Sequence, residues 1–424
     1  MFKMRAKGIF PICMFTAQLL SSMPTGAQED KTVASSDKPW VETHFPIIAW
    51  NILNPTHSPA VKSESLYRDL AEAGYNVAGF VPREDLHRAK AAGIKAVLYD
   101  AMFWEMAKAP VTPIVRNQMY AGLLPDPASL ESVVGIYIVD EPTAAAFEPA
   151  RNAVQSLGAV APNLWPFITF LPYYAEPKLH GFPDYASYVQ AGTADVGAWN
   201  FSGCFYGLME DGTLRDGYWS HLRTLREVTL KNHKPFYHFV LTTPHFKHRE
   251  PSDADLAFTM FTGLSYGAKG LLHFTACAPP TGNYRLAPID QFGRKTSTFD
   301  LVQNLNQKIS TLGPTLLGLK SQRVYFTGQA PAGENPPSKE SFVKALDFDA
   351  VIGDFTDEKG GRYVLITNTN LFKSQRCDPA LADGSRLELL CPYTGQWKPY
   401  EGEQMWLAPG HGVLLRLLPK KLDP

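Results

Sequence analysis

Two adjacent carboxylic acids end an apolar run in the middle of the chain. In "GIYIVDEPTAAAF", residues 135–147, Asp140 and Glu141 follow a strand-like segment and precede Pro142. A carboxyl group that lies beside a second one in apolar surroundings is a candidate general acid, because both conditions raise its pKa. The side chains of a strand alternate between faces, so we expect Glu141 to face a substrate as the proton donor and Asp140 to support it. A structural salt bridge is the alternative role for Glu141.

This stretch resembles the end of the fourth strand in the clan A glycoside hydrolases, which are (β/α)8 barrels. There the strand ends in an acidic or amide residue, then Glu, and often Pro, and Glu141 falls on the position of the general acid/base. The segments "GIYIVDEP", "YGAKGLLHFT" and "LELLCPYTGQW…LAPGHGVLLRL" are also similar to exported bacterial glycosidases, related to β-galactosidases, in which a barrel precedes a β-sandwich. The resemblance implies an exported glycoside hydrolase with Glu141 as its acid.

The resemblance is incomplete at the seventh strand, where the clan carries its nucleophilic Glu. Glycoside hydrolysis uses two carboxyl groups, about 5 Å apart for retention and about 6.5–9.5 Å apart for inversion. Here the end of that strand reads "HFVLTTPHF", which contains no acid. Asp100 is the preferred second carboxylate because it ends the neighbouring third strand, and Glu250 and Asp290 in later loops are the other candidates. Capping of the following segment is the equal alternative for Asp100.

Aromatic, amide and imidazole side chains recur near the expected strand ends. Aromatic faces stack on the apolar faces of sugars, and amides and imidazoles hydrogen-bond to hydroxyl groups. Each such residue alone is more simply explained by core packing, so the prediction depends on several of them meeting at one end of a barrel. The candidate substrate-binding residues are Trp50, Asn51, Trp104, Tyr173 with its neighbour Tyr174, Trp199, Asn200, Tyr206, His238, His245 and His273.

Metal and cofactor chemistry has little support in the sequence. His245 and His248 have an H-x-x-H spacing that could hold a metal ion in a metal-assisted hydrolase, but no third histidine or carboxylate is visibly arranged with them. The chain has no P-loop, no dinucleotide-binding glycine motif and no G-x-S-x-G elbow. We therefore expect no metal and no cofactor. The formal net charge of -1 offers no field that would attract nucleic acid, so a carbohydrate is the expected partner.

Eight strand-like runs alternate with amphipathic segments between residues 44 and 313. Their length and order match a (β/α)8 TIM barrel, whose working residues lie at the carboxyl ends of the strands. A doubly wound open sheet is the alternative fold. The runs are residues 45–51, 75–81, 94–100, 133–141, 165–171, 194–201, 234–243 and 267–276.

Proline and glycine mark the expected helix limits. Pro82 opens a helix that Gly93 closes, and Pro142 opens one that Gly158 closes. The pair Ser252 and Asp255 has the spacing of a capping box. The last helix of the set, residues 298–312, carries an apolar stripe and is expected to end before Gly313.

The sequence divides into a leader, a linker and two folded parts. Residues 1–27 have basic residues, a short apolar run and small residues before Gln28, which is typical of a cleaved secretory signal peptide. Residues 28–43 are the linker, 44–313 the barrel, and 318–424 a small all-β sandwich rich in turn residues. No later segment is apolar for long enough to span a membrane. We expect a periplasmic or extracellular protein, in which Cys377 and Cys391 are close enough in sequence to form a disulfide.

Together these features predict an exported glycoside hydrolase that cleaves a poly- or oligosaccharide by carboxylate acid/base catalysis. The alternative is a catalytically silent carbohydrate-binding barrel, which the missing acid at strand seven favours. The two differ in whether a glycan that binds is also cleaved.

Overall fold

The structure is a computed structural model that describes residues 39–50, 63–175, 181–197, 200–201 and 205–420. The expected signal peptide and most of the linker lie outside these residues. These described residues form one compact unit. Within the described residues, no helix is both long and apolar enough to cross a membrane.

Parallel strands β1 to β8 form one curled sheet. They pair in chain order, and β8 also pairs with β1, so that Ile48 lies opposite both Val77 and Leu272. Each predicted strand-like run contains one strand, and β6 is described at Asn200–Phe201. The strands are β1 Ile47–Ala49, β2 Val77–Val81, β3 Lys95–Leu98, β4 Val133–Asp140, β5 Trp165–Thr169, β6 Asn200–Phe201, β7 Phe236–Leu241 and β8 Leu271–Phe274.

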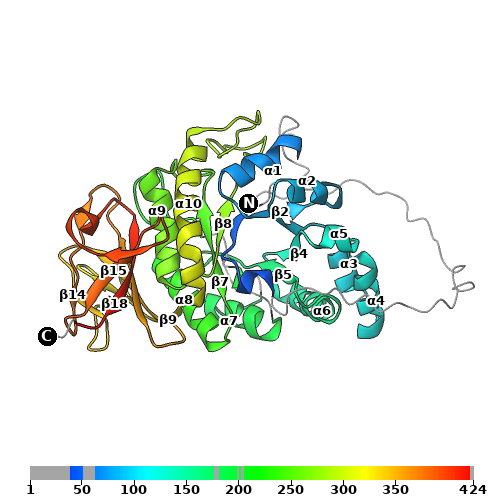
Figure 1. Ribbon diagram of the computed structural model, residues 1–424. Coiled ribbons are helices and arrows are strands. Elements are labelled where there is room, and N and C mark those ends of the chain that lie inside the picture. Colours follow the sequence, from blue (N-terminus) through cyan, green and yellow to red (C-terminus); the bar gives the residue numbers. More distant parts are fainter. Residues whose placement is uncertain (1–38, 51–62, 176–180, 198–199, 202–204, 421–424) are drawn as a thin grey trace, which may run out of the picture. The chain divides into compact units, whose positions relative to one another are not determined.

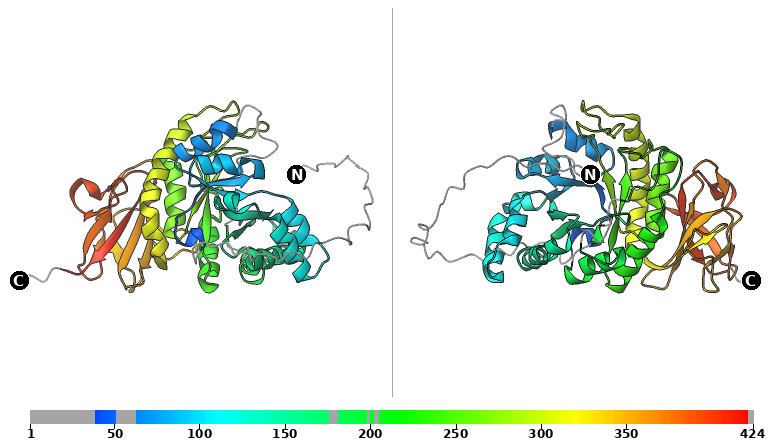
Figure 2. Two further views of the ribbon diagram at one scale, coloured as in Figure 1. Left: turned by 45° about the vertical axis from the view of Figure 1, so that its right-hand side comes forward. Right: turned by 180° about the vertical axis from the view of Figure 1, so that it is seen from behind.

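Helices lie around the outside of this sheet (Figure 1, Figure 2). The capping box that begins α9 is confirmed, because the Ser252 side chain and the Asp255 side chain each accept from the other residue's backbone N–H. The helices are α1 Ser63–Glu72, α2 Leu86–Ala91, α3 Met102–Lys108, α4 Pro113–Leu123, α5 Pro127–Leu130, α6 Ala144–Val160, α7 Tyr185–Gln190, α8 Tyr218–Lys231, α9 Asp253–Ser265 and α10 Ser297–Gly318.

Two of the predicted helix ends are wrong, because glycine is used there inside a helix. Helix α6 continues past Gly158 to Val160, and α10 continues through Gly313 and Pro314 to Gly318. A Cβ atom on Gly313 would lie 2.5 Å from the Cβ of Phe45. Gly313 therefore permits close packing of α10 on the segment before β1 rather than ending the helix.

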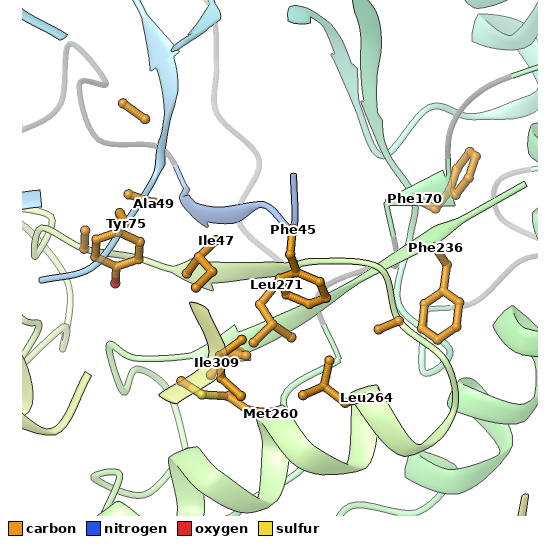
Figure 3. Close-up of a cluster of buried hydrophobic side chains, with 14 of the residues drawn as sticks. Phe45, Ile47, Ala49, Tyr75, Phe170, Phe236, Met260, Leu264, Leu271 and Ile309 are labelled. Carbon is orange, nitrogen blue, oxygen red and sulfur yellow. The ribbon is translucent and has the colours of Figure 1, made fainter. Parts of the chain in front are cut away.

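The two faces of the curled sheet have separate apolar cores. Ile48, Phe167, Phe239 and their neighbours fill the inside, where one cluster gathers residues of β1 to β5, β7 and β8. The outer face carries Ile47 and Leu271, which point toward Met260 and Leu264 of α9 (Figure 3). This alternation assigns each residue of a regular strand to the inside or to the helices.

An antiparallel module follows α10. Its six-stranded sheet has the order β16-β15-β18-β12-β11-β9, and two-stranded sheets β10-β14 and β13-β17 accompany it. The chain is thus a mixed α/β protein with a curled parallel sheet, covered by helices, and additional antiparallel sheets. The strands are β9 Lys320–Thr327, β10 Val343–Ala345, β11 Ala350–Thr356, β12 Arg362–Asn368, β13 Gln375–Arg376, β14 Ala380–Leu381, β15 Arg386–Leu390, β16 Trp397–Pro399, β17 Trp406–Leu407 and β18 Gly412–Leu418.

The antiparallel module packs directly on α9. Ser265 Oγ and Thr367 Oγ1 are 3.0 Å apart, and a Cβ atom on Gly353 would lie 2.2 Å from the Ser265 carbonyl oxygen. Cys377 and Cys391 both belong to the module's apolar core, but both are free thiols, so the suggested disulfide is absent.

Candidate active site

The end of β4 departs from regular strand geometry just before the acid pair. Tyr137 lies opposite Phe167 and Asp140 opposite Thr169, with one extra β4 residue between these two pairs. Phe167 belongs to the inner core, so Thr169, two residues further along, has the same face. The bulge therefore gives Asp140 an inward position that simple alternation from Tyr137 would not give it.

Glu141 follows with a left-handed backbone conformation. Its φ angle is 45°, and its N–H donates to the carbonyl oxygen of Thr169 at 2.9 Å. A residue with positive φ no longer obeys the alternation of a strand, so two consecutive carboxyl groups can lie at the same edge of the sheet. Both acids are solvent-accessible there.

The surroundings raise the pKa values of both acids. Although solvent reaches the side chains, the enclosing protein desolvates them and raises the pKa of Asp140 to about 6, an effect that the nearby Thr169 hydroxyl partly opposes. Desolvation first, and then the charge of Asp140, raise the pKa of Glu141 to about 7. Because the two groups titrate as a coupled pair, near neutral pH the pair retains a proton while carrying negative charge.

Tyrosine and other aromatic rings surround the acid pair. Burial raises the pKa of Tyr137 above its usual value, and the charges of Asp140 and Glu141 raise it further, so this phenol lies near both carboxyls. Its ring is 4.4 Å from that of Phe80 and 5.5 Å from that of Tyr99. Trp50, a predicted substrate-binding residue, is only 3% exposed and packs on Phe80 with ring centroids 4.5 Å apart. Trp50 therefore forms part of the inner core beneath these rings.

The preferred second carboxylate, Asp100, is engaged in structural contacts. Its Oδ2 accepts from Arg83 Nε at 2.6 Å, and its Oδ1 accepts from the backbone N–H of Met102 at 2.9 Å, at the start of α3. Of the two other candidates, Glu250 pairs with Arg285 at 2.9 Å, and Asp290 accepts from the backbone N–H groups of its own turn. Within the described part of the chain, the carboxylate whose charge bears on Glu141 is Asp140.

A second cluster forms where the loops after β6, β7 and β8 meet. The ring centroids of Tyr206 and His245 are 5.2 Å apart, and each of these rings lies within 5.5 Å of Phe274, the last residue of β8. His245 Nδ1 lies 3.0 Å from the Thr243 carbonyl oxygen, and its ring stacks on Tyr284 at 4.9 Å. The structure thus brings together Tyr206 and His245 from the predicted set.

His238 and His273 do not face the inside of the sheet. On β7 the inner positions belong to Tyr237 and Phe239, so His238 points toward α9, where Gly263 leaves room for its ring. His273 alternates in the same way with the inner residues of β8, and its Nδ1 lies 3.1 Å from the hydroxyl of Tyr75. Both imidazoles are completely buried in the layer between strands and helices, which does not favour contact with a substrate.

The remaining predicted residues are dispersed or undescribed. Trp104 lies in α3 and packs against the outer core. Tyr173, in the loop after β5, lies 5.2 Å from the ring of Tyr185. Asn200 is in β6 without a described side chain, and Asn51 and Trp199 lie outside the described residues.

Sequence reasoning missed three residues close to these groups. Tyr137 is a polar aromatic residue inside an apolar strand, three positions before the acid pair, and that placement was an available signal. Thr169 is indicated only once the β4 bulge is known. Arg215, whose Nη2 lies 3.2 Å from His248 Nε2, follows a turn and has no distinguishing spacing. Among the described residues, no group of three or more His, Cys, Asp or Glu side chains could hold a metal ion.

Comparison with known proteins supports the fold. No protein-family model matches the chain, and no curated protein matches it in sequence. A family 5 glycoside hydrolase from Bacteroides vulgatus superimposes with a TM-score of 0.52 and 11% identity, over 88% of this chain and 89% of that one. A second structure, described as a glycoside hydrolase, gives a TM-score of 0.51 and 12% identity over 89% of this chain and 94% of that one.

A β-galactosidase from the psychrophilic Marinomonas ef1 is also similar, at a TM-score of 0.46 and 8% identity over 64% of this chain. The match spans 61% of that enzyme's length. The chain has the fold of glycoside hydrolases, as the resemblance at the fourth strand implied.

Proposed function

We propose that the protein is an exported (β/α)8-barrel glycoside hydrolase of the TIM-barrel kind that acts on a poly- or oligosaccharide. The observation that carries the proposal is the acid pair at the end of β4, where desolvation and mutual repulsion raise the pKa of Glu141 to about 7. A carboxylic acid with such a pKa retains a proton near neutral pH and can donate it to a leaving group.

In the proposed reaction Glu141 protonates the glycosidic oxygen while the bond from that oxygen to the anomeric carbon breaks. Asp140 has the lower pKa, about 6, and in its ionised form stabilises the positive charge that develops on the sugar ring. Water then adds its oxygen to the anomeric carbon, and its released proton returns to the carboxylate pair. Asp100 is assigned a structural role in this scheme because Arg83 and the start of α3 occupy both its oxygens.

The test is a panel of glycans and aryl glycosides presented to the wild type, Glu141→Gln and Asp140→Asn. We expect reducing ends to appear on at least one glycan with the wild type, and rates at least about 100-fold lower in either variant, since general acid catalysis contributes about 100- to 10,000-fold. Glycans that bind to all three forms without any product would refute hydrolysis and support the silent binding protein instead. Amino-terminal sequencing of the protein secreted by its host tests export, with a mature end at Gln28 expected.

A further inference from the structure

Arg215 lies in the loop region between β6 and α8 with an incompletely used guanidinium group. Its backbone N–H donates to the Gly207 carbonyl oxygen at 2.7 Å, at the base of a turn. The guanidinium carbon lies 4.2 Å from the centroid of the Tyr174 ring, and Nη2 contacts His248 Nε2 at 3.2 Å and Met209 Sδ at 3.5 Å. Within the described residues, the N–H groups on Nε and Nη1 have no hydrogen-bond partner.

Two arginines of the same loop region differ from Arg215 in having acidic partners. Arg249 pairs with Asp255, and Arg285 pairs with both Glu210 and Glu250. Arg215 forms no ion pair with a carboxylate of the described chain. An arginine held against an aromatic ring at the loop edge of this sheet, with its charge uncompensated, is suited to an anionic ligand.

His248 fixes the guanidinium without neutralising it. This imidazole is 2% exposed, and desolvation, followed by the charges of His245 and Arg215, lowers the pKa of His248 to about 4. The ring is therefore neutral at ordinary pH, and its Nε2 accepts from Arg215, which leaves the hydrogen on Nδ1. Among the described groups Nδ1 has no hydrogen-bond partner, so the cluster contains a second unused donor.

Arg215 is connected to the acid pair through Tyr174 and the loop after β5. Tyr174, on which the guanidinium rests, follows β5, and β5 is the strand that pairs with β4 and its two acids. The causes that raise the pKa of Glu141 are desolvation and the charge of Asp140, and Arg215 is not among them. It is placed to bind part of a substrate rather than to take part in bond cleavage.

We propose that Arg215, held by Tyr174 and His248, binds an anionic group of the substrate, so that the substrates are acidic glycans bearing carboxylate or sulfate. The unused N–H groups on Nε and Nη1 can donate to the oxygens of either group, and the guanidinium charge strengthens these hydrogen bonds. This inference rests on the proposed glycosidase function, but it assigns the substrate class through a residue that takes no part in the acid/base chemistry.

The test measures binding separately from cleavage. Calorimetry with the Glu141→Gln protein compares tetrasaccharides of three kinds: uronate-containing, sulfate-bearing, and neutral counterparts of the same backbones. We expect at least one acidic tetrasaccharide to bind about tenfold or more tightly than its neutral counterpart, and added salt to reduce that preference. Whether the uronate or the sulfate probe is preferred identifies the anionic group.

Three variants in the same background assign the preference to Arg215. Arg215→Ala should bring the acidic and neutral ligands within about twofold of each other. Arg215→Lys should give an intermediate preference, because lysine keeps the charge without the fixed donor directions of the guanidinium. Arg294→Ala is the matched control, since Arg294 is an exposed arginine that also rests on a ring, that of Phe292, at 4.9 Å. It should leave the preference unchanged.

The possible results separate this inference from the proposed function. No preference for any acidic probe, or a preference that survives Arg215→Ala in a folded protein, overturns the anion site. Hydrolysis of a neutral glycan at the same rate by the wild type and Arg215→Ala would support the glycosidase function and refute the anion site. An acidic glycan that binds through Arg215 but is never cleaved by the wild type would support the anion site and refute the glycosidase function.

Discussion

The backbone N–H of Glu141 donates to the carbonyl oxygen of Thr169 at 2.9 Å, while Glu141 itself has a φ angle of 45°. This left-handed conformation costs a non-glycine residue on the order of 1–3 kcal/mol, and it persists only where the surrounding structure enforces it. Glycine would adopt it without strain, so a glutamate at this point fits the proposed role of its carboxyl group.

Replacing Glu141 with glycine and with alanine should separate strain from chemistry. Both changes remove the carboxyl group and should abolish hydrolysis, but only glycine adopts positive φ freely. We expect Glu141→Gly to be about 1 kcal/mol more stable toward unfolding than Glu141→Ala, measured by denaturant titration. Equal stabilities, or a more stable alanine variant, would show that the conformation at residue 141 is not strained.

The coupled acids predict a narrow pH range for activity. The rate should rise as Asp140 ionises near pH 6 and fall as Glu141 loses its proton near pH 7, so kcat/KM should follow a bell-shaped profile. In Glu141→Gln the descending limb should disappear, and aryl glycosides whose leaving groups need no protonation should lose the least activity. A wild-type profile that is flat between pH 5 and pH 8, on the order of one unit beyond each pKa, would contradict this assignment.

The raised pKa of Glu141 should also make the stability of the protein depend on pH. An acid whose folded-state pKa lies above its unfolded value stabilises the fold only at low pH, so the wild type should lose stability as pH rises from 4.5 to about 7. Glu141 is exposed, so solvent screens its charge. At pH 8 the free energy of unfolding of Glu141→Gln should therefore exceed that of the wild type by only on the order of 1 kcal/mol. The two proteins should converge near pH 4, which serves as the internal control.

Asp100 tests whether the neighbouring strand supplies a catalytic acid. Its contacts with Arg83 and the N–H of Met102 predict that Asp100→Asn lowers the melting temperature by a few degrees, since about 1 kcal/mol is lost, and changes kcat by less than about threefold. Asp140→Asn is the comparison, because it should reduce kcat by about 100-fold or more. A similar loss of kcat in Asp100→Asn would show that Asp100 takes part in catalysis.

The sequence predicted most of the scaffold because buried parallel strands appear as apolar runs, such as "IKAVLYD" around β3, and because the Ser252–Asp255 capping box has a local signature.

Helix ends and side-chain directions were predicted poorly where tertiary packing overrides a local signal. Gly313 accommodates Phe45 instead of ending α10, and the β4 bulge turns Asp140 toward the inside. His238 was placed at the strand end without regard to alternation, which assigns it to the helix side. Arg215 had no detectable signal, because its neighbours Tyr174 and His248 are distant in the sequence.

The packing of the antiparallel module on α9 should be sensitive to a single methyl group. A Cβ atom on Gly353 would lie 2.2 Å from the carbonyl oxygen of Ser265, so Gly353→Ala must displace β11 from the helix. We expect a loss of about 1–3 kcal/mol, and faster hydrogen exchange in β11 and β12. Gly122→Ala is the matched control, because that exposed glycine in α4 has no neighbour within 4 Å and alanine should stabilise the helix slightly. Equal stability of the two variants would exclude a close contact at Gly353.

Lys269 joins the strand side of the fold to the end of α10 through its buried ammonium group. Nζ donates to the carbonyl oxygens of Leu316 at 2.7 Å and Leu317 at 3.1 Å, and also to that of Leu319. Lys269→Met keeps the apolar stem but leaves these carbonyls without a charged donor, so we expect a loss of about 2–4 kcal/mol, against almost none for the exposed Lys320→Met.

Burial also lowers the pKa of Lys269 to about 8 from 10.5, so the unfolded chain binds this proton more tightly than the folded one. By linkage, the wild type should gain stability relative to Lys269→Met as pH rises from about 8 toward 10.5. Calorimetric melting of both proteins at several pH values in that range measures the difference. If the stability difference between the wild type and Lys269→Met instead became smaller as pH rises, the prediction would be wrong. The charged ammonium would then stabilise the end of α10 despite its desolvation.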